Sequence, residues 1–378
     1  MAAKYLGFII GPGSAGQSWT KPLQKYAHRF TTWGSMRLGA FLGMLAYKSF
    51  ISSVLSYIWQ LEPNPDNLLD DFEKALRKMM PGPGSWVSRG DLCNLKAYGF
   101  PIEFPDPRWT AMAAKLRVVH QIASDCEQKH KDIQILPLEM GRRPFPSWHR
   151  RCYFSVLAEA LSLCRDRGIT LKRIAAIEAS CDRARSFQNI AEEAISSKFR
   201  DPYFRESRIR AHGVFWKFSV LPGHLETRVL SRFRILAERA PLKVWFVYFR
   251  TMWNGWVTYD RMKQLLPPRP CLLGCGYDED RVDHYCCCNV YWSFLRRPRP
   301  QGLGIQSERS KDTALLLNKS LSDEDVLRLA IGLYALYRTV NAVRFSEPHE
   351  APSDFHRLLR MFAKQAVNAS NGRQLLLP

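Results

Sequence analysis

Acidic residues are scarce in this chain of 378 residues, where 35 Asp and Glu stand against 55 Lys and Arg and the formal net charge is +20. This deficit excludes a charge-balanced surface and favours polyanionic partners, nucleic acid first. With 46% hydrophobic and 24% charged residues, the composition also excludes a disordered chain. The length suits a globular protein of two or three domains.

Two targeting or anchoring signals are also missing. The stretch Met1–Ile10 lacks the basic-then-apolar order of a secretory signal. The apolar stretch Leu38–Leu61 is interrupted by Lys48, Gly39 and Gly43, so it predicts a buried helix and not a membrane span. We therefore expect an intracellular protein, nuclear or cytoplasmic, with no membrane partner. In a reducing compartment its cysteines would be metal ligands or buried thiols.

Half of the ten cysteines lie in one short stretch with the pattern CxxxC-x8-HxxxC, from Cys271 and Cys275 through His284 to Cys288. Two thiolates on a glycine-bearing turn, followed by an imidazole and a thiolate, supply the four N and S donors that tetrahedral zinc prefers. The stretch is too short to bury a core of its own, so metal binding would contribute most of its folding energy.

The fourth ligand is ambiguous because three consecutive cysteines follow His284. Cys288 is preferred, since His and Cys four residues apart share a helical face, and Cys286 is the alternative. The alternative to a zinc site is a cysteine-rich loop that binds no metal. A catalytic zinc would need an open coordination position. We interpret the acids of 278–280 as a solvated loop, and expect a structural Zn²⁺.

Apolar residues recur at helical spacing through most of the chain and predict a mainly α protein. We expect a helical thumb-like bundle after a short N-terminal β element, a helical middle region, a small CCHC zinc knuckle and a C-terminal helical segment. The boundaries that we expect are 1–15 for the β element, 16–110 for the thumb-like region, 111–266 for a basic, aromatic-rich helical connection, 267–300 for the knuckle, and 301–378 for the C-terminal helices.

Basic residues beside aromatics are candidates for contact with a nucleic-acid backbone. For the basic stretch 140–151 a solvated linker is the alternative. Within 212–263 the aromatic residues more often indicate core, whereas the arginines are expected to be exposed. The candidates are Lys25 and Arg29 on the first helix, Arg142, Arg143, Arg150 and Arg151 in the linker 140–151, and Arg296 and Arg297 after the knuckle.

Three motifs occur in an order that resembles a known family. They are the Lys4-Tyr5-Leu6-Gly7 run, the Ser53-Val54-Leu55-Ser56-Tyr57-Ile58 stretch, and the late Cys-Cys-His-Cys knuckle with Trp292, with Pro81-Gly82-Pro83-Gly84-Ser85-Trp86 between them. This order resembles the end of the palm, the thumb and the C-terminal region of non-LTR (LINE-type) retrotransposon reverse transcriptases. The knuckle departs from the commoner CxxC form by one residue in its first pair.

The resemblance implies that the first strand belongs to a primer-grip hairpin, that the following helices form a thumb, and that the knuckle contacts RNA or DNA. The family's aromatic-x-Asp-Asp turn is not found, and the pair Asp70-Asp71 fits the first turn of an amphipathic helix. Two-metal phosphoryl transfer needs those carboxylates. We therefore expect no polymerase activity from this chain alone, and a catalytic half of the enzyme as one partner.

Our hypothesis is a nucleic-acid-binding C-terminal fragment of a retrotransposon reverse transcriptase that contacts the RNA or DNA backbone. The alternative is a helical protein–protein interaction module with a structural zinc, in which the basic surface is incidental. The sequence leaves open whether RNA or DNA is preferred.

Overall fold

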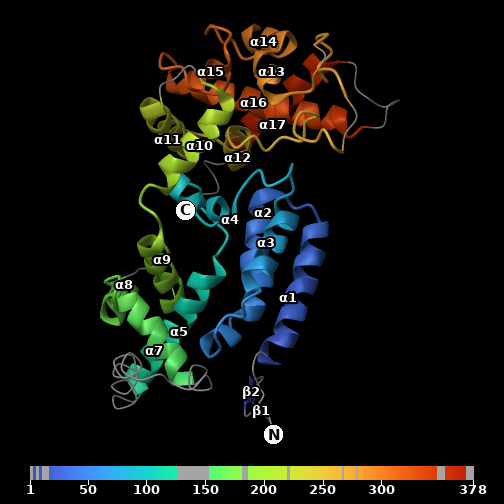
Figure 1. Cartoon of the computed structure of the whole chain (residues 1–378). Coiled ribbons are helices and arrows are strands. Elements are labelled where there is room, and N and C mark those ends of the chain that lie inside the picture. The colour runs from blue at the N-terminus through green and yellow to red at the C-terminus, as the bar shows by residue number, and fades with distance from the viewer. Residues whose placement is uncertain are drawn as a thin grey trace. The chain divides into compact units, whose positions relative to one another are not determined.

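The computed structural model describes residues 3–5, 8–10, 17–125, 153–180, 186–218, 222–265, 268–277, 279–346 and 354–371. These residues are mainly helical, as the periodicity predicts (Figure 1). The chain divides into two compact units, each built from two stretches of sequence. Unit 1 comprises Met1–Pro81 and Ile102–Pro202, and unit 2 comprises Gly82–Pro101 and Tyr203–Pro378.

Unit 1 begins with an antiparallel hairpin in which Lys4 pairs with Ile9. Helices follow. The elements are β1 (Ala3–Tyr5), β2 (Phe8–Ile10), α1 (Gln17–Ser35), α2 (Gly39–Ala46), the π-helix η1 (Tyr47–Ile51), the 3-10 turns η2 (Ser52–Leu55) and η3 (Ile58–Gln60), α3 (Leu68–Met79), α5 (Pro107–Asp125), α7 (Tyr153–Arg165), α8 (Leu171–Ser180) and α9 (Phe187–Phe199).

Helices α1 and α3 lie side by side in unit 1 and bury one face each (Figure 1). Tyr26 of α1 and Tyr47 of η1 are both 1% exposed, and their hydroxyl oxygens lie 2.9 Å apart in a hydrogen bond. Phe72 of α3 packs against the ring of Tyr47 at 5.6 Å between centroids. The opposite face of α1 carries the basic residues, so the amphipathic pattern determines which side reaches solvent.

The apolar stretch Leu38–Leu61 does not form the single buried helix that its composition predicts. It breaks after α2 into η1, η2 and η3. Serine side chains explain the break, because Ser52 Oγ donates to Lys48 O at 3.1 Å and Ser56 Oγ donates to Ser53 O at 2.8 Å, in competition with regular helical bonding. The burial is also incomplete, since Leu42 of α2 is 54% exposed.

Unit 2 contains the aromatic-rich segment and the cysteine cluster. Its elements are α4 (Arg89–Leu92), the 3-10 turn η4 (Leu95–Tyr98), α10 (Phe204–Trp216), α11 (Pro222–Arg239), α12 (Leu242–Met252), α13 (Val282–Cys287), α14 (Asn289–Arg296), α15 (Lys311–Ala314), α16 (Asp323–Arg344) and α17 (Phe355–Asn371).

The aromatic residues of unit 2 form its core, as expected for aromatics at this density. Trp245 stacks on Phe100 with centroids 3.9 Å apart, and Trp253 stacks on Phe249 at 4.2 Å. The expectation that the nearby arginines are exposed is wrong for Arg232, which is 8% exposed. Its guanidinium donates to the carbonyl of Leu316 at 2.8 Å, so this arginine ties α11 to the chain after α15.

Candidate metal centre

The first two cysteines of the pattern lie on a tight turn before α13. The backbone N–H of Cys271 donates to Tyr277 O at 2.8 Å, and that of Gly274 donates to Cys271 O at 3.0 Å. Gly274 and Gly276 have φ angles of 70° and 82°, which side chains with a Cβ rarely adopt. The glycines therefore let the turn bring both sulfurs to one side.

The other two ligands come from successive short helices. His284 lies on α13, and Cys288 is the N-cap residue of α14. The structure places Cys288 in the cluster, but the helical-face argument for it is wrong, because α13 ends at Cys287 and Cys288 has an extended backbone with ψ 134°. This break directs the Cys288 sulfur to the cluster, whereas Cys286 is buried with 0% exposure outside it.

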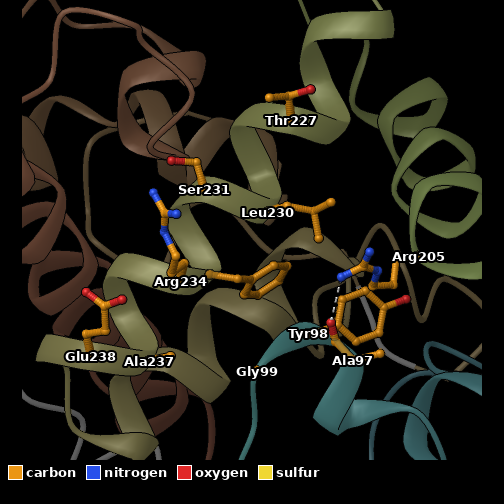
Figure 2. Close-up of a pocket in the computed structure, with 11 residues that line it drawn as sticks. Ala97, Tyr98, Gly99, Arg205, Thr227, Leu230, Ser231, Arg234, Ala237 and Glu238 are labelled. Atoms are coloured by element: carbon orange, nitrogen blue, oxygen red, sulfur yellow. Dashed lines mark hydrogen bonds between the residues drawn. The ribbon is translucent and has the colours of Figure 1, made fainter. Parts of the chain in front are cut away.

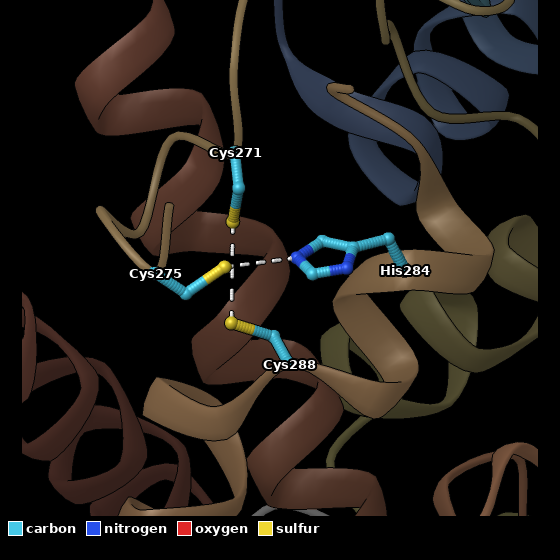
Figure 3. Close-up of side chains that lie close together, drawn as sticks. All are labelled: Cys271, Cys275, His284 and Cys288. Carbon is cyan, nitrogen blue, oxygen red and sulfur yellow. Dashed lines mark hydrogen bonds between the residues drawn. The ribbon is translucent and has the colours of Figure 1, made fainter. Parts of the chain in front are cut away.

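The four donor atoms converge on one point, as Figure 3 shows. They all lie within 4.8 Å of one another. The Sγ atoms of Cys271 and Cys288 are 3.9 Å apart, and Cys275 Sγ lies 3.2 Å from His284 Nε2. A tetrahedron with metal–sulfur bonds of 2.3 Å has edges of about 3.8 Å, so these donors fit a four-coordinate ion. Four protein ligands leave no open position, which favours a structural role.

Local hydrogen bonds favour the thiolate form of Cys288. The hydrogen bond from the Cys271 thiol is the largest influence that lowers the pKa of Cys288, followed by His284 and by the N–H groups of Tyr291 and Val290. Those two N–H groups belong to the first turn of α14, where the positive end of the helix dipole stabilises an anion. Burial raises the pKa of Cys286, which keeps that neighbouring thiol protonated.

Side chains around the cluster hold its ligands in place. The ring of Tyr277 stacks on His284 with centroids 4.1 Å apart and an interplanar angle of 3°. The hydroxyl of Tyr285, the residue after His284, donates to Asp280 Oδ1 at 2.7 Å and accepts from the N–H of Leu272 at 3.2 Å. Because Leu272 lies between the two cysteines of the turn, Tyr285 connects both halves of the cluster.

The interpretation of 278–280 as a solvated loop is wrong for Asp280, which is 0% exposed. Its carboxylate accepts two bonds from Arg344 Nη2 of α16, at 2.6 and 2.7 Å, and one from the N–H of Tyr259 at 2.9 Å. A buried carboxylate needs such partners. The two residues are 64 positions apart in the sequence, so local spacing could not predict the pair. The ion pair connects the segment between Cys275 and α13 to α16.

The predicted nucleic-acid-binding residues fall in separate places. Lys25 is exposed on α1, whereas Arg29 donates to the carbonyl of Phe50 and contributes to packing. At the end of α14, Arg296 is exposed and Arg297 is half-buried. The four linker candidates Arg142, Arg143, Arg150 and Arg151 lie outside the described residues.

Helix α17 carries exposed cations that were not among the predicted nucleic-acid-binding residues. Arg357, Arg360 and Lys364 are exposed, and the whole helix contains no Asp or Glu. The missing acids over 355–371 were a signal available in the sequence, because exposed helix faces usually mix both charge signs.

Unit 2 also contains a pocket of about 590 Å³ beside α11 and η4 (Figure 2). Its lining includes the rings of Tyr98 and Phe233, and the guanidinium of Arg205, which donates to Ala97 O at 3.3 Å. Among its described lining residues there is no histidine, no cysteine and no pair of carboxylates. This pocket therefore lacks the groups that acid–base or thiol catalysis uses.

Comparisons with known proteins gave no match: no protein-family model, no curated protein and no solved structure matches this chain. Within the part of the chain that the structure describes, no helix is both long and apolar enough to cross a membrane.

Proposed function

We propose that this chain binds nucleic acid and that its Cys3His cluster holds a structural Zn²⁺. One observation carries the proposal: the fourth ligand, Cys288, caps α14, and this helix ends in the cations Arg296 and Arg297 without any acid along it. A bound ion would thus fix a basic helix in place. In a chain of net charge +20, such a helix is suited to phosphate contact.

Zinc is the metal that best suits the donor set. Three cysteine sulfurs and one imidazole within 4.8 Å match the soft ligands and tetrahedral geometry of structural zinc sites. Magnesium and calcium prefer oxygen ligands, so this cluster disfavours them.

The order of the sequence motifs also suggests the class of protein from which this chain derives. We interpret the chain as the end of the palm, the thumb and the knuckle of a non-LTR retrotransposon reverse transcriptase. The antiparallel pairing of β1 with β2 supports the interpretation, because Lys4 and Tyr5 of the motif then lie in a strand that pairs with Phe8–Ile10. Without an aromatic-x-Asp-Asp turn in these 378 residues, we expect primer-extension assays with Mg²⁺ to show no product.

Filter binding to RNA and to single-stranded DNA at several salt concentrations tests the proposed function. We expect affinity at low salt that weakens steeply as salt increases, because each neutralised phosphate releases counterions. A zinc-loaded protein with no affinity for either nucleic acid at low salt contradicts the proposal.

A second candidate function, a protein–protein interaction module, is favoured by exposed apolar side chains in unit 1. Phe41, Leu42 and Leu45 of α2 are 37%, 54% and 38% exposed, and Phe50 of η1 is 50% exposed. Contiguous apolar surface of this kind often marks an interaction site. Binding of a protein partner that persists at high salt and is lost in a Leu42→Ser/Leu45→Ser variant supports this candidate.

A further inference from the structure

Helix α17 has two faces of different character. Leu359, Phe362 and Ala366 are 0%, 6% and 0% exposed and pack toward α16, which lies beside it (Figure 1). Arg357, Arg360 and Lys364 are exposed at positions i, i+3 and i+7 of the other face. At a rise of 1.5 Å per residue these cations cover about 10 Å of the helix. They form a row of positive charge with no acid in the helix.

The C-terminal half of α14 lies against the start of α17. Ser293 Oγ of α14 is 3.4 Å from His356 Nε2 of α17. The pKa of His356 is lowered by burial and by the positive charges of Arg297 and Arg360, one from each side of this contact, while the Asp354 carboxylate opposes the shift. The fold therefore brings together cations that are about 60 residues apart in the sequence into one surface, which we call the α14–α17 surface. Its cations are Arg296, Arg297, Arg357, Arg360 and Lys364.

No described residue forms an ion pair with any of these five cations. Arg299 is different, because its guanidinium lies 3.6 Å from the carboxylate of Glu324. We therefore leave Arg299 out of the surface. The nearest acid in sequence to α17 is Asp354, whose Oδ1 accepts the backbone N–H of Arg357 at 2.8 Å and so caps the helix.

Four of the aromatic rings on these two helices point inward, and the half-buried ring of Phe355 lies against the turn at Gly274. Tyr291, Trp292 and Phe294 of α14 and Phe362 of α17 are 0%, 2%, 1% and 6% exposed. Base stacking needs an accessible ring face, which none of these four offers. The surface thus presents cations without stacking platforms, and cations alone contact phosphates without reading bases.

The cation row is also linked to the metal centre. Phe355, the first residue of α17, lies so close to the ligand turn that a Cβ at Gly274 would be 3.1 Å from its ring. The turn with Cys271 and Cys275 therefore supports the start of α17, as Cys288 supports the start of α14.

We infer that α14 and α17 together form a docking surface for the phosphate backbone of nucleic acid, without preference for base sequence. This assignment rests on the proposed function and locates nucleic-acid binding on the α14–α17 surface. Because the contacts are electrostatic, binding here should depend on salt and should be similar for strands of different sequence.

The test replaces the α17 row with glutamine in an Arg357→Gln/Arg360→Gln/Lys364→Gln variant of the full chain. Glutamine has a helix propensity close to that of Arg and Lys, so α17 should persist. The matched control is Arg234→Gln/Arg261→Gln/Lys319→Gln, which removes the same charge from exposed positions elsewhere in unit 2. Bound zinc and thermal unfolding of both variants should equal those of the wild type.

Binding is measured to two 20-base-pair DNA duplexes of different sequence at several salt concentrations. Loss of three phosphate contacts reduces the magnitude of the negative slope of log K against log salt by about 2.7, since each contact on a duplex contributes roughly 0.9. We expect a decrease of this size for the α17 variant on both duplexes, and a clearly smaller one for the control. Equal slopes and affinities for the two variants overturn the α14–α17 surface while leaving the proposed function in place. A wild type without affinity at low salt overturns both.

Discussion

The two acid-poor regions of this protein support their cations in different ways. In unit 1 the first acidic residue is Glu62, so α1 presents Lys21 and Lys25 with no acid nearby in sequence. The support there is hydrophobic packing and a buried tyrosine pair. In unit 2 the acid-free helices α14 and α17 begin beside a Cys3His cluster.

A basic surface must be stabilised by packing or bonding on its buried side, because repulsion between like charges destabilises the compact state. A long amphipathic helix can bury enough apolar area to provide this stabilisation. Helix α14, with eight residues, is too short to do so alone. A metal ion bound by the Cys3His cluster would supply stability at one point, and the buried Asp280–Arg344 pair joins the segment before α13 to α16. Substitutions in each unit distinguish these two kinds of support.

Removal of a metal ligand should have the largest effect, and it should affect unit 2 but not unit 1. We expect Cys275→Ser to lower bound zinc below one equivalent, because structural zinc contributes on the order of 10 kcal/mol to the folding of such sites. Elemental analysis measures the metal, and hydrogen exchange should show lost protection from Arg269 through α14 with α1 and α3 unchanged.

Cys287→Ser is the matched control, because Cys287 is half-buried next to the cluster but is not one of its four ligands. We expect this variant to retain its zinc and its hydrogen-exchange protection. Full zinc retention by Cys275→Ser contradicts the proposed ligand set.

Breaking the buried ion pair should affect unit 2 next most strongly. Asp280→Ala leaves the Arg344 guanidinium, 4% exposed, without its carboxylate. Loss of one partner of a buried pair costs about 3–5 kcal/mol. Denaturant unfolding should show this decrease, whereas Glu279→Ala removes only an exposed pair with Arg281 and should cost less than about 1 kcal/mol. An Asp280→Ala variant as stable as the wild type means that the pair contributes little.

A buried lysine offers a pH test in unit 1. Burial lowers the pKa of Lys115 to about 8, and the Glu159 carboxylate opposes that shift. The unfolded chain, with a lysine pKa near 10.5, binds more protons between pH 8 and 10.5, so stability rises with pH across this window.

Below pH 8 the full penalty applies, and we expect Lys115→Met to stabilise unit 1 at pH 7 by up to about 3 kcal/mol. The gain should disappear above pH 10.5. Denaturant midpoints at both pH values measure it, with no change in bound zinc. An equal gain at both pH values excludes proton linkage as its cause.

The smallest effect should come from the tyrosine pair of unit 1. Tyr26→Phe removes the 2.9 Å hydrogen bond to Tyr47, which should cost about 1 kcal/mol. Tyr57→Phe is the control, since Tyr57 is 47% exposed. Thermal unfolding compares the two, and zinc content should stay at the wild-type value in both. If the loss of thermal stability in Tyr26→Phe depends on added chelator, the stability of unit 1 is not independent of bound metal.

Local patterns predicted much of the helical fold. Asp70 and Asp71 lie in the first turn of α3, where acids favour the dipole, as their position in the sequence predicts. The stretch Leu38–Leu61 could not be predicted in this way, because serine hydroxyls compete with the backbone there and because exposed apolar residues look the same in sequence as buried ones.

The sequence by itself determined the ligand types, the glycine turn between Cys271 and Cys275, and the excess of positive charge, because these depend on residue identity and short spacing. Only the tertiary structure decided that Cys288 and not Cys286 completes the cluster, that Asp280 is buried against Arg344, and that the cations of α14 and α17 meet in one surface. These are contacts between segments up to about 60 residues apart, and such contacts follow from the packing of apolar faces and not from any local pattern.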